Sequence, residues 1–551
     1  MQTREGESFL RGAFVLTLAT LITRLLGLLY KPVVARIFAP FDGRGGAVGL
    51  GLTQVPVTAY QIVLSFTSVG LNVGIARLVA ERMALGDVRG ARRVFRSSLA
   101  LMAGLGLAGA VAFFFGAPWI ARAISSEVVE AAPGFRAMAP ALFLTSVLAA
   151  YRGLFQGFQQ MSPTAVSQIV EQVVRVTAGA ALTWALVRVS VPMGAAGFNL
   201  GDVLGAAAAL AYMLILSARR GPGLWQAELA AADGPGTPAG PAAGAARAGR
   251  LPRGLRLYGR IFAVAAPITV VGAVVPLMMM ADALFVFRAL SAAGVTGVDA
   301  QEQYGLLTNV FMIVNLPAII STAVYTAVLP ALAGAAALGR TGDALRKARQ
   351  AYRITFLLGI PAQAGIWVLA AGIYRLIYGA PAGGQALEAM AWSVLPIMLQ
   401  QTTSGVLQGI GRIGVPVRNF VLGAAVKIGL TAWWTGPYGI AGAAWATAAG
   451  FGVAAVLNLV DVERQLGRTV QTRSMVWKPL AAALAMAGLL RFLQPHLPPG
   501  NAGVLLAVAA GAAVYGLVLL AVGGVHRRDV AALPRFGPRL AVMLDRTRLL
   551  R

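Results

Sequence analysis

Stretches of about 20 apolar residues recur along most of this chain, and no other feature restricts its fold more strongly. A helix of that length crosses the hydrocarbon core of a membrane. Short breaks rich in Arg, Gly or Pro separate the stretches, and the period-two alternation of an outer-membrane barrel is missing. Because backbone groups in lipid must find their hydrogen bonds within the protein, the sequence predicts an all-α polytopic membrane protein.

Composition supports the same class. Hydrophobic residues make up 58% of the 551 positions and charged residues only 12%, which is too few to cover a water-soluble domain. Mean hydropathy is +0.73. We predict about fourteen spans, near 12–38, 50–79, 97–121, 135–155, 164–187, 194–217, 259–289, 304–333, 354–378, 386–410, 415–434, 438–460, 476–494 and 502–524.

The net charge of +26 is concentrated in loops that follow the even-numbered spans. By the positive-inside rule these loops face the cytoplasm, so we expect both termini on the cytoplasmic side of a bacterial inner membrane. The rule accounts for the charge without a nucleic-acid partner, and we expect none. The basic segments are 82–96, 219–260, 340–353, 412–418, 464–478 and 527–551.

Two motifs occur twice in the same order. GDVRGARRVFRS follows the second span and GDALRKARQAYRI the eighth, while GLFQGFQQM ends the fourth span and GVLQGIGRI the tenth. The second match places Arg175 on Lys427. These repeats predict two duplicated six-helix lobes in the same orientation, with the substrate bound between them near the midplane.

A segment of mostly Gly, Ala and Pro from Gly221 to Gly254 predicts a flexible connection between the lobes. We therefore predict an N-lobe over 1–218, a flexible cytoplasmic linker over 219–257, a C-lobe over 258–464, and two further spans with a basic tail over 465–551.

Basic residues inside the predicted spans indicate a cavity. Each would cost about 2.5–3.5 kcal/mol facing lipid at mid-bilayer, so these side chains are expected to face protein, water or the interface. Arg24 and Lys31 are seven residues apart, which puts them on one face of the first helix, and we assign both to substrate binding. Arg77 and Arg152 lie near cytoplasmic ends, where they either extend to the interface or, for Arg77, line the cavity.

The fifth span carries a polar stripe of Gln168, Glu171, Gln172 and Arg175 on one helix face. Glu171 and Arg175 are spaced to form an ion pair, and the alternative is that Arg175 faces the cavity. Lys427, at the corresponding position of the second copy, has no carboxylate four residues to either side. It is therefore the better candidate for binding an anion.

Asp282 is taken as the other deep carboxylate, which either binds a coupling cation or proton or pairs with a cavity arginine, and Arg288 follows it on the same span. Basic residues then outnumber Glu171 and Asp282 within the spans. A cavity with surplus positive charge suits a diphosphate, because one guanidinium group can bind phosphate oxygens bidentately, through two parallel hydrogen bonds.

Catalysis finds no support in the sequence. Cysteine is absent, both histidines lie at membrane edges, and no HExxH, GxSxG or nucleotide-binding glycine loop occurs. We expect no enzyme activity, no metal site, no nucleotide and no cofactor, with coupling to Na⁺ or H⁺ left open. The expected partners are an anionic lipid-linked substrate and membrane lipids. We expect the protein itself to be a monomer.

Several of these segments resemble the stage V sporulation protein B group of Gram-positive bacteria, within the multidrug/oligosaccharidyl-lipid/polysaccharide (MOP) exporter superfamily that also holds the MurJ lipid II flippases. The resemblance rests on SFLRGAFVLTLATLITRLLGLLYKPVVARIF, GIARLVAERMALGD, YRGLFQGFQQMSPTAVSQIVEQVVRV, APITVVGAVVPLMMMADALFVFR and NLPAIISTAVYTAVLPALA.

This resemblance implies a MATE/MurJ-like transporter that flips undecaprenyl-diphosphate-linked peptidoglycan precursor by alternating access through a positively lined cavity. It places Arg24, in the TRLLG motif, on the family's essential cavity arginine and Lys31 beside a second basic position. An acidic residue of the MurJ second span is missing from GLTQVPVTAYQ. The alternatives are an exporter of another polyprenyl-linked glycan, a Na⁺- or H⁺-coupled multidrug antiporter, and a scaffold that transports nothing.

Overall fold

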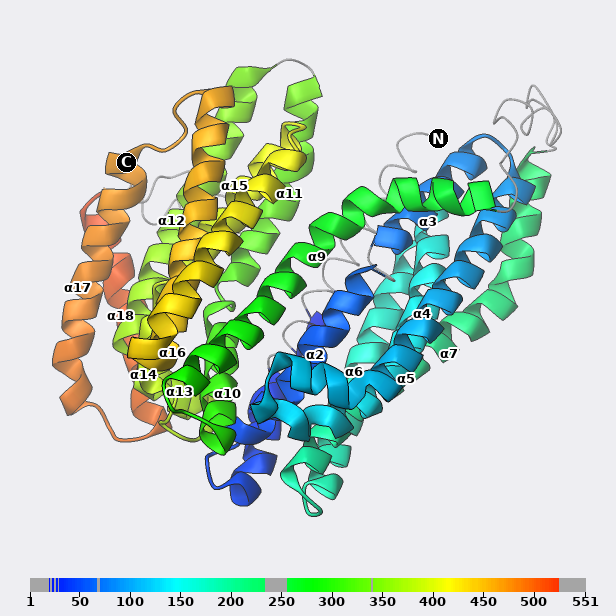
Figure 1. The fold of residues 1–551 in the computed structure, drawn as a ribbon. Coiled ribbons are helices and arrows are strands. Elements are labelled where there is room, and N and C mark those ends of the chain that lie inside the picture. Colours follow the sequence, from blue (N-terminus) through cyan, green and yellow to red (C-terminus); the bar gives the residue numbers. More distant parts are fainter. Residues whose placement is uncertain are drawn as a thin grey trace. The chain divides into compact units, whose positions relative to one another are not determined.

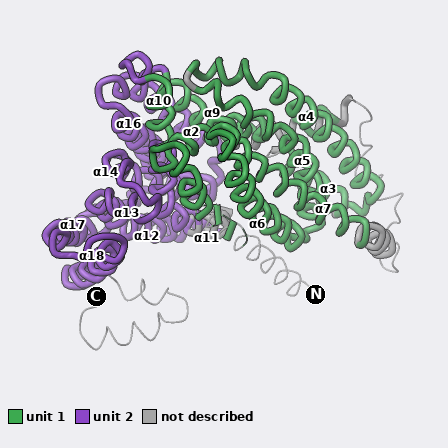
Figure 2. The backbone as a smooth tube through the Cα atoms, turned by 90° about the horizontal axis from the view of Figure 1, so that it is seen from below, with its two compact units in different colours: residues 1–287, 296–305 green, residues 288–295, 306–551 purple. Residues whose placement is uncertain are grey.

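The computed structural model describes residues 19, 22–23, 26–27, 29–66, 70–232, 255–337 and 340–524, and these form helices without any strand. The chain divides into two compact units (Figure 2). Unit 1 comprises residues 1–287 and 296–305, and unit 2 comprises residues 288–295 and 306–551. Arg24, one of the predicted substrate-binding residues, lies outside the described residues.

Unit 1 begins with a first helix that is continuous over residues 29–42. The helices that follow are α2 (Ala47–Leu64), α3 (Gly70–Ala84), α4 (Val88–Ile124), the short η2 (Ser126–Ala131), α5 (Ala132–Gly157), α6 (Met161–Leu186), α7 (Val191–Ala232) and most of α9 (Leu255–Ala292) (Figure 1).

Unit 2 contains the rest of the helices. They are α10 (Gly297–Val314) from residue 306 on, α11 (Ala318–Ala337), α12 (Thr341–Val368), α13 (Ala370–Tyr378), α14 (Gly384–Ala391), α15 (Val394–Gly409), α16 (Gly414–Leu466), η3 (Arg473–Trp477), α17 (Lys478–Leu493), η4 (Gln494–His496) and α18 (Asn501–Ala521).

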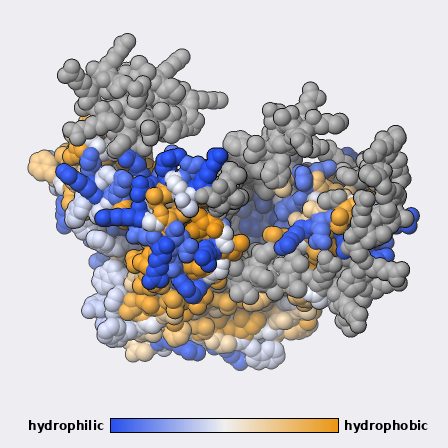
Figure 3. Space-filling model, turned by 90° about the horizontal axis from the view of Figure 1, so that it is seen from above, coloured by the Kyte–Doolittle hydropathy of each residue, from blue (hydrophilic) through white to orange (hydrophobic). Residues whose placement is uncertain are grey.

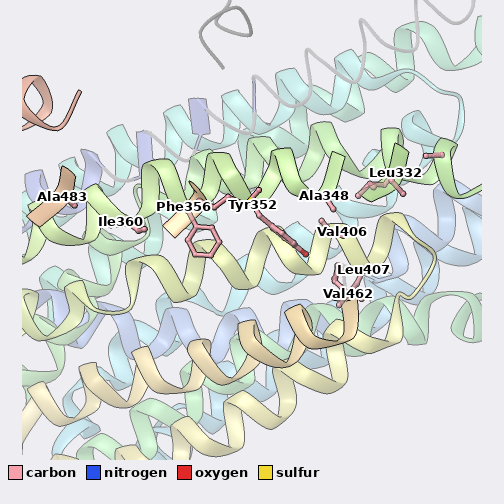
Figure 4. Packing of buried hydrophobic residues seen from close by; sticks show 12 residues of the cluster. Leu332, Ala348, Tyr352, Phe356, Ile360, Val406, Leu407, Val462 and Ala483 are labelled. Atoms are coloured by element: carbon pink, nitrogen blue, oxygen red, sulfur yellow. The ribbon is translucent and has the colours of Figure 1, made fainter. Parts of the chain in front are cut away.

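Each unit has its own apolar core. In unit 1, α3, α4 and α5 bury side chains such as Ile75, Val94 and Ala150. In unit 2, α11, α12 and α15 do the same with a cluster that includes Tyr352 and Val406 (Figure 4). On the face drawn in Figure 3, hydrophilic side chains gather together while apolar ones form a band along the lower edge. A helix can expose apolar side chains in this way where lipid covers it.

Large aromatic side chains mark helix ends. Two exposed tryptophans, Trp119 and Trp184, lie near the ends of α4 and α6. A third, Trp433, lies near the end of the first arm of α16, which is the part of that helix before the break at Gly439. The sequence predicts the outer membrane surface at all three positions. Tryptophan concentrates at membrane–water interfaces because its ring is apolar and its N–H is polar. These positions therefore agree with the predicted span ends.

Within the described residues, eight helices are long and apolar enough to cross a membrane, or nine if the bent pair α12–α13 counts as one span. The pair bends by 82°. Two predicted spans form one continuous element, α16, with a break at Gly439, whose φ is +58°, so they count once. The count also covers the described residues alone, and part of the first predicted span lies outside them. The count of about fourteen therefore stays a prediction.

The linker is shorter than predicted. α7 continues through 219–232 and α9 begins at Leu255, so helix covers both ends of the range predicted as flexible. The segment LWQAELAAA, which follows Pro222, consists mainly of strong helix formers, and this explains the extension. The remainder, 233–254, lies outside the described residues. The two units also divide within α9 and α10, whereas the sequence placed the lobe boundary at the linker.

The internal repeat is visible in how two helix pairs pack. A methyl group on Gly197 of α7 would lie 2.6 Å from the carbonyl oxygen of Leu182 in α6. A methyl group on Gly442, in the second arm of α16, would lie 2.2 Å from the carbonyl oxygen of Trp434 in the first arm. The shift from Leu182 to Trp434 is the one that places Arg175 on Lys427.

A second glycine pair confirms that alignment. A methyl group on Gly205 would meet the carbonyl oxygen of Glu171 at 2.6 Å and Cβ of Arg175 at 3.1 Å. A methyl group on Gly450 would meet the carbonyl oxygen of Gly423 at 2.7 Å and Cβ of Lys427 at 2.5 Å. Both helix pairs thus use glycine to bring their backbones together in the same way, as membrane helices commonly do.

Candidate functional site

Lys31, in the first helix, is half-buried and donates a hydrogen bond of 2.7 Å to the side-chain oxygen of Gln54 in α2. Gln54 is buried and also lies 3.4 Å from the hydroxyl of Thr58, one turn further along α2. Gln54 belongs to the GLTQVPVTAYQ segment. Because its amide is neutral, the contact orients the ammonium group without cancelling its charge.

The first helix is seated against α6 and α7. The ring of Tyr30 stacks on that of Phe198 with 4.8 Å between the centroids, and the Tyr30 hydroxyl lies over Gly179. One turn earlier, a methyl group on Gly27 would lie 3.2 Å from the side-chain nitrogen of Gln172. Small residues at these points let the helices approach closely, and this fixes the direction in which Lys31 projects.

An ion network joins α5, α6 and α7 inside unit 1. Nη2 of Arg152 lies 2.7 Å from one oxygen of Glu171, and Nη2 of Arg175 lies 2.6 Å from the other. Nε of Arg175 lies 2.9 Å from Asp202. The four side chains expose between 11% and 28% of their surface, so the charges are largely screened from water and balance one another.

This network corrects two expectations. Arg152 does not extend to the interface: besides Glu171, its Nε donates a 2.9 Å hydrogen bond to the hydroxyl of Ser167. Asp202, within the predicted sixth span, is a third carboxylate inside the spans besides Glu171 and Asp282, and it is buried. Buried charges persist where they are paired, so an aspartate in the apolar sequence GFNLGDVLG was itself the signal for a partner. Of the two alternatives for Arg175, the structure shows the ion pair with Glu171.

Lys427, in the first arm of α16, is buried, with 2% of its surface exposed. Its Nζ lies 5.9 Å from the centroid of the Phe311 ring, within the range of a cation–π contact. By the glycine alignment, the positions of Glu171 and Asp202 correspond in this unit to Gly423 and Thr447. The two related basic residues therefore lie on similar backbones with different side chains around them.

The other predicted site residues are dispersed. Arg77 on α3 and Arg288 on α9 are exposed, while Asp282 on α9 and Gln168 on α6 are half-buried. Within the described residues, no group of three or more His, Cys, Asp or Glu side chains lies close enough to hold a metal ion.

The sequence of this chain is similar to those of known proteins along almost its whole length. The chain is 27% identical over 541 residues to Stage V sporulation protein B of Bacillus subtilis (strain 168), covering 96% of this chain and 98% of the relative. It is 26% identical over 539 residues to Lipid II flippase MurJ of the same organism, covering 93% of this chain and 94% of the relative.

Structural comparison agrees with the sequence. A solved structure described as Lipid II flippase MurJ, inward closed conformation, matches with a TM-score of 0.63 and 14% identity, covering 92% of this chain and 98% of that one. At this identity the likeness establishes the fold. The long apolar helices and this likeness make the chain a multi-pass membrane protein.

A family profile described as Polysaccharide biosynthesis protein matches residues 9–335, more than half of the chain. The chain therefore belongs to the polysaccharide biosynthesis protein family.

Proposed function

We propose that this protein flips an undecaprenyl-diphosphate-linked peptidoglycan precursor, lipid II, from the inner to the outer leaflet of the bacterial cytoplasmic membrane. The observation that carries the proposal is the contact between Lys31 and Gln54, which holds a positive charge in place with a neutral partner. A diphosphate is the matching ligand, since a charge-assisted hydrogen bond to an anion is stronger than one to a neutral group. The similarity to Lipid II flippase MurJ points to the same cargo.

In this mechanism Lys31 binds the diphosphate while the lipid tail stays in the bilayer, and Arg24 and Lys427 are the other basic residues that the sequence assigns to the cargo. Alternating access then exposes the bound headgroup to the outside. A membrane potential negative inside favours outward movement of an anion by about 2.3 kcal/mol per charge per 100 mV. The potential can thus supply direction without a nucleotide, provided that both termini lie in the cytoplasm as the loop charges predict.

The test uses a bacterial strain depleted of its own flippase, in which an externally added toxin that cleaves lipid II reports how much precursor reaches the outer leaflet. Lys31→Gln should lower the cleaved fraction by about 10- to 100-fold, because one hydrogen bond to a charged group is lost. Lys31→Arg should retain most of the activity. Arg36→Gln, which removes an exposed charge from the same helix, is the matched control and should behave like the wild type.

Normal toxin cleavage with Lys31→Gln, at equal amounts of protein in the membrane, would rule out Lys31 as a diphosphate ligand. If the wild type itself fails to restore cleavage, lipid II is not the cargo.

A second candidate is export of another polyprenyl-linked glycan, which is favoured by the similarity to Stage V sporulation protein B over nearly the whole chain. Such a cargo presents the same diphosphate, so the same basic residues would be needed. Rescue of a sporulation defect by the wild type, without any change in lipid II cleavage, would favour this candidate.

An ion-coupled antiporter needs a carboxylate available to a cation or a proton. Glu171 and Asp202 lie together in unit 1, which the sequence analysis did not anticipate, but both are engaged by arginines. This pairing argues against a coupling site at these two carboxylates.

A further inference from the structure

The ion network of Arg152, Glu171, Arg175 and Asp202 is not required for packing α6 on α7. The two arms of α16 pack through the equivalent glycines, Gly442 and Gly450, with Gly423 and Thr447 at the positions of the two carboxylates. The same backbone geometry therefore forms in unit 2 without these acids. A buried ion network is costly to assemble because its charges lose water, so its presence in unit 1 calls for a role beyond helix packing.

Each guanidinium nitrogen of Arg175 lies next to a polar side chain of its own unit. Nη2 binds Glu171 at 2.6 Å, Nε binds Asp202 at 2.9 Å, and Nη1 donates to the side-chain oxygen of Gln172 at 3.4 Å. Its positive charge is also offset, because the network contains two arginines and two carboxylates. A phosphate bound here would lie beside two carboxylates, which repel it.

The network leads to the first helix. Gln172, which accepts from Arg175, lies against Gly27, and Gly27 precedes Lys31 by four residues, on the same helix face. Further along α6 and α7, Gly179 and Phe198 receive Tyr30. The surface that α6 and α7 present to the first helix therefore lies directly beside the network, and Gln172 belongs to both.

We infer that this network positions the first helix, so that Arg175 is a positioning residue that aims Lys31 and not a ligand of the transported anion. Asp202 is the residue that completes it. This inference rests on the proposed function only for the identity of the cargo, because the seating of the first helix is measurable without any transport assay.

The decisive test removes charges in pairs. Arg175→Gln alone leaves Glu171 and Asp202 with one arginine between them, whereas Arg175→Gln with Asp202→Asn restores the charge balance. A substrate ligand cannot be rescued by deleting its neighbour, but a member of a neutral network can. We expect the single variant to lower transport at least about tenfold and the double variant to recover most of the loss. Arg188→Gln, at the far end of α6 over the ring of Trp184, is the control and should leave transport unchanged.

Seating of the first helix is read from a cysteine placed at Val34, which is fully buried in that helix. The chain has no cysteine of its own, so a membrane-permeant maleimide reports this position alone. In the Val34→Cys background, labelling should be slow, should accelerate at least about tenfold with Arg175→Gln, and should slow again in the double variant.

The inference is overturned if the single and double variants both lose transport while the introduced cysteine stays protected from the maleimide, since Arg175 then acts on the cargo directly. If Arg175→Gln does not reach the membrane, Arg175→Lys replaces it. Lysine keeps the charge but has a single nitrogen, so labelling should be intermediate; unaltered labelling together with lost transport would also reject the inference. Failure of the wild type to move lipid II would refute the proposed cargo and leave the labelling result intact.

Discussion

The glycine contacts inside α16 make a quantitative prediction. A methyl group on Gly450 would lie 2.5 Å from Cβ of Lys427 and 2.7 Å from the carbonyl oxygen of Gly423, closer than atoms in folded proteins approach. Both neighbours are held by the backbone of the opposite arm, so the two arms must separate to admit it. Gly450→Ala should therefore cost about 1–3 kcal/mol, as overpacking of a close contact does.

Gly452 supplies the matched control. It lies in the same arm of α16, and a methyl group there would meet nothing within 4 Å. Gly452→Ala should be neutral or gain up to about 1 kcal/mol, because alanine loses less backbone entropy than glycine when a helix forms.

The assay is thermal unfolding of purified protein in detergent. For a unit of this size, about 2–4 °C accompanies each kcal/mol, so Gly450→Ala should lower Tm by about 2–12 °C relative to the wild type. Gly205→Ala should give a loss of similar size in unit 1, where the methyl group would lie 2.6 Å from the carbonyl oxygen of Glu171. Equal Tm values for Gly450→Ala and Gly452→Ala would refute the close approach of the two arms and with it the structural repeat.

Two further predictions concern single polar contacts. Asp87 caps the first turn of α4 by accepting a hydrogen bond from the backbone N–H of Gly90. Asp87→Ala should be less stable to unfolding than Asp87→Asn by about 0.5–2 kcal/mol, because asparagine can still cap the helix. Equal stabilities of the two variants would contradict the cap. Arg44, in the loop before α2, donates hydrogen bonds to Asp299 and Glu302 of α10. Arg44→Ala should therefore accelerate amide hydrogen exchange in the first turns of α10, while Arg36→Ala should not. Unchanged exchange in Arg44→Ala would show that Arg44 does not hold these turns.

The sequence predicts the helices well because, in lipid, the backbone N–H and C=O groups of each apolar run must hydrogen-bond to one another within that run. It also predicts the pairing of Glu171 with Arg175, since residues four apart on a helix lie side by side. Breaks were harder to predict. The bend between α12 and α13 depends on how a whole helix packs, and the sequence there remains apolar on both sides. The break at Gly439, by contrast, lies next to the boundary predicted between 415–434 and 438–460.

The candidate site was predicted only in part, for a physical reason. Arg152, Asp202 and Gln54 lie far along the chain from the residues that they bind, so no periodicity links them to their partners. Arg152 lies near the cytoplasmic end of its predicted span, and a long basic side chain there usually extends to the membrane–water interface. Its carboxylate partner on another helix outweighed that tendency.

The repeated helix pairs explain why the two units differ in charge while sharing a backbone. Glycine governs the approach of the helices at Gly205 and Gly450, and the side chains next to each contact do not determine it. Those side chains are therefore free to differ, as Asp202 and Thr447 do at equivalent positions. A symmetric backbone does not imply a symmetric electric field. It follows that Arg175 and Lys427, although they correspond in position, cannot be assigned the same role from the repeat alone: the charge of Arg175 is offset by acids on its own unit, and that of Lys427 lies beside the ring of Phe311.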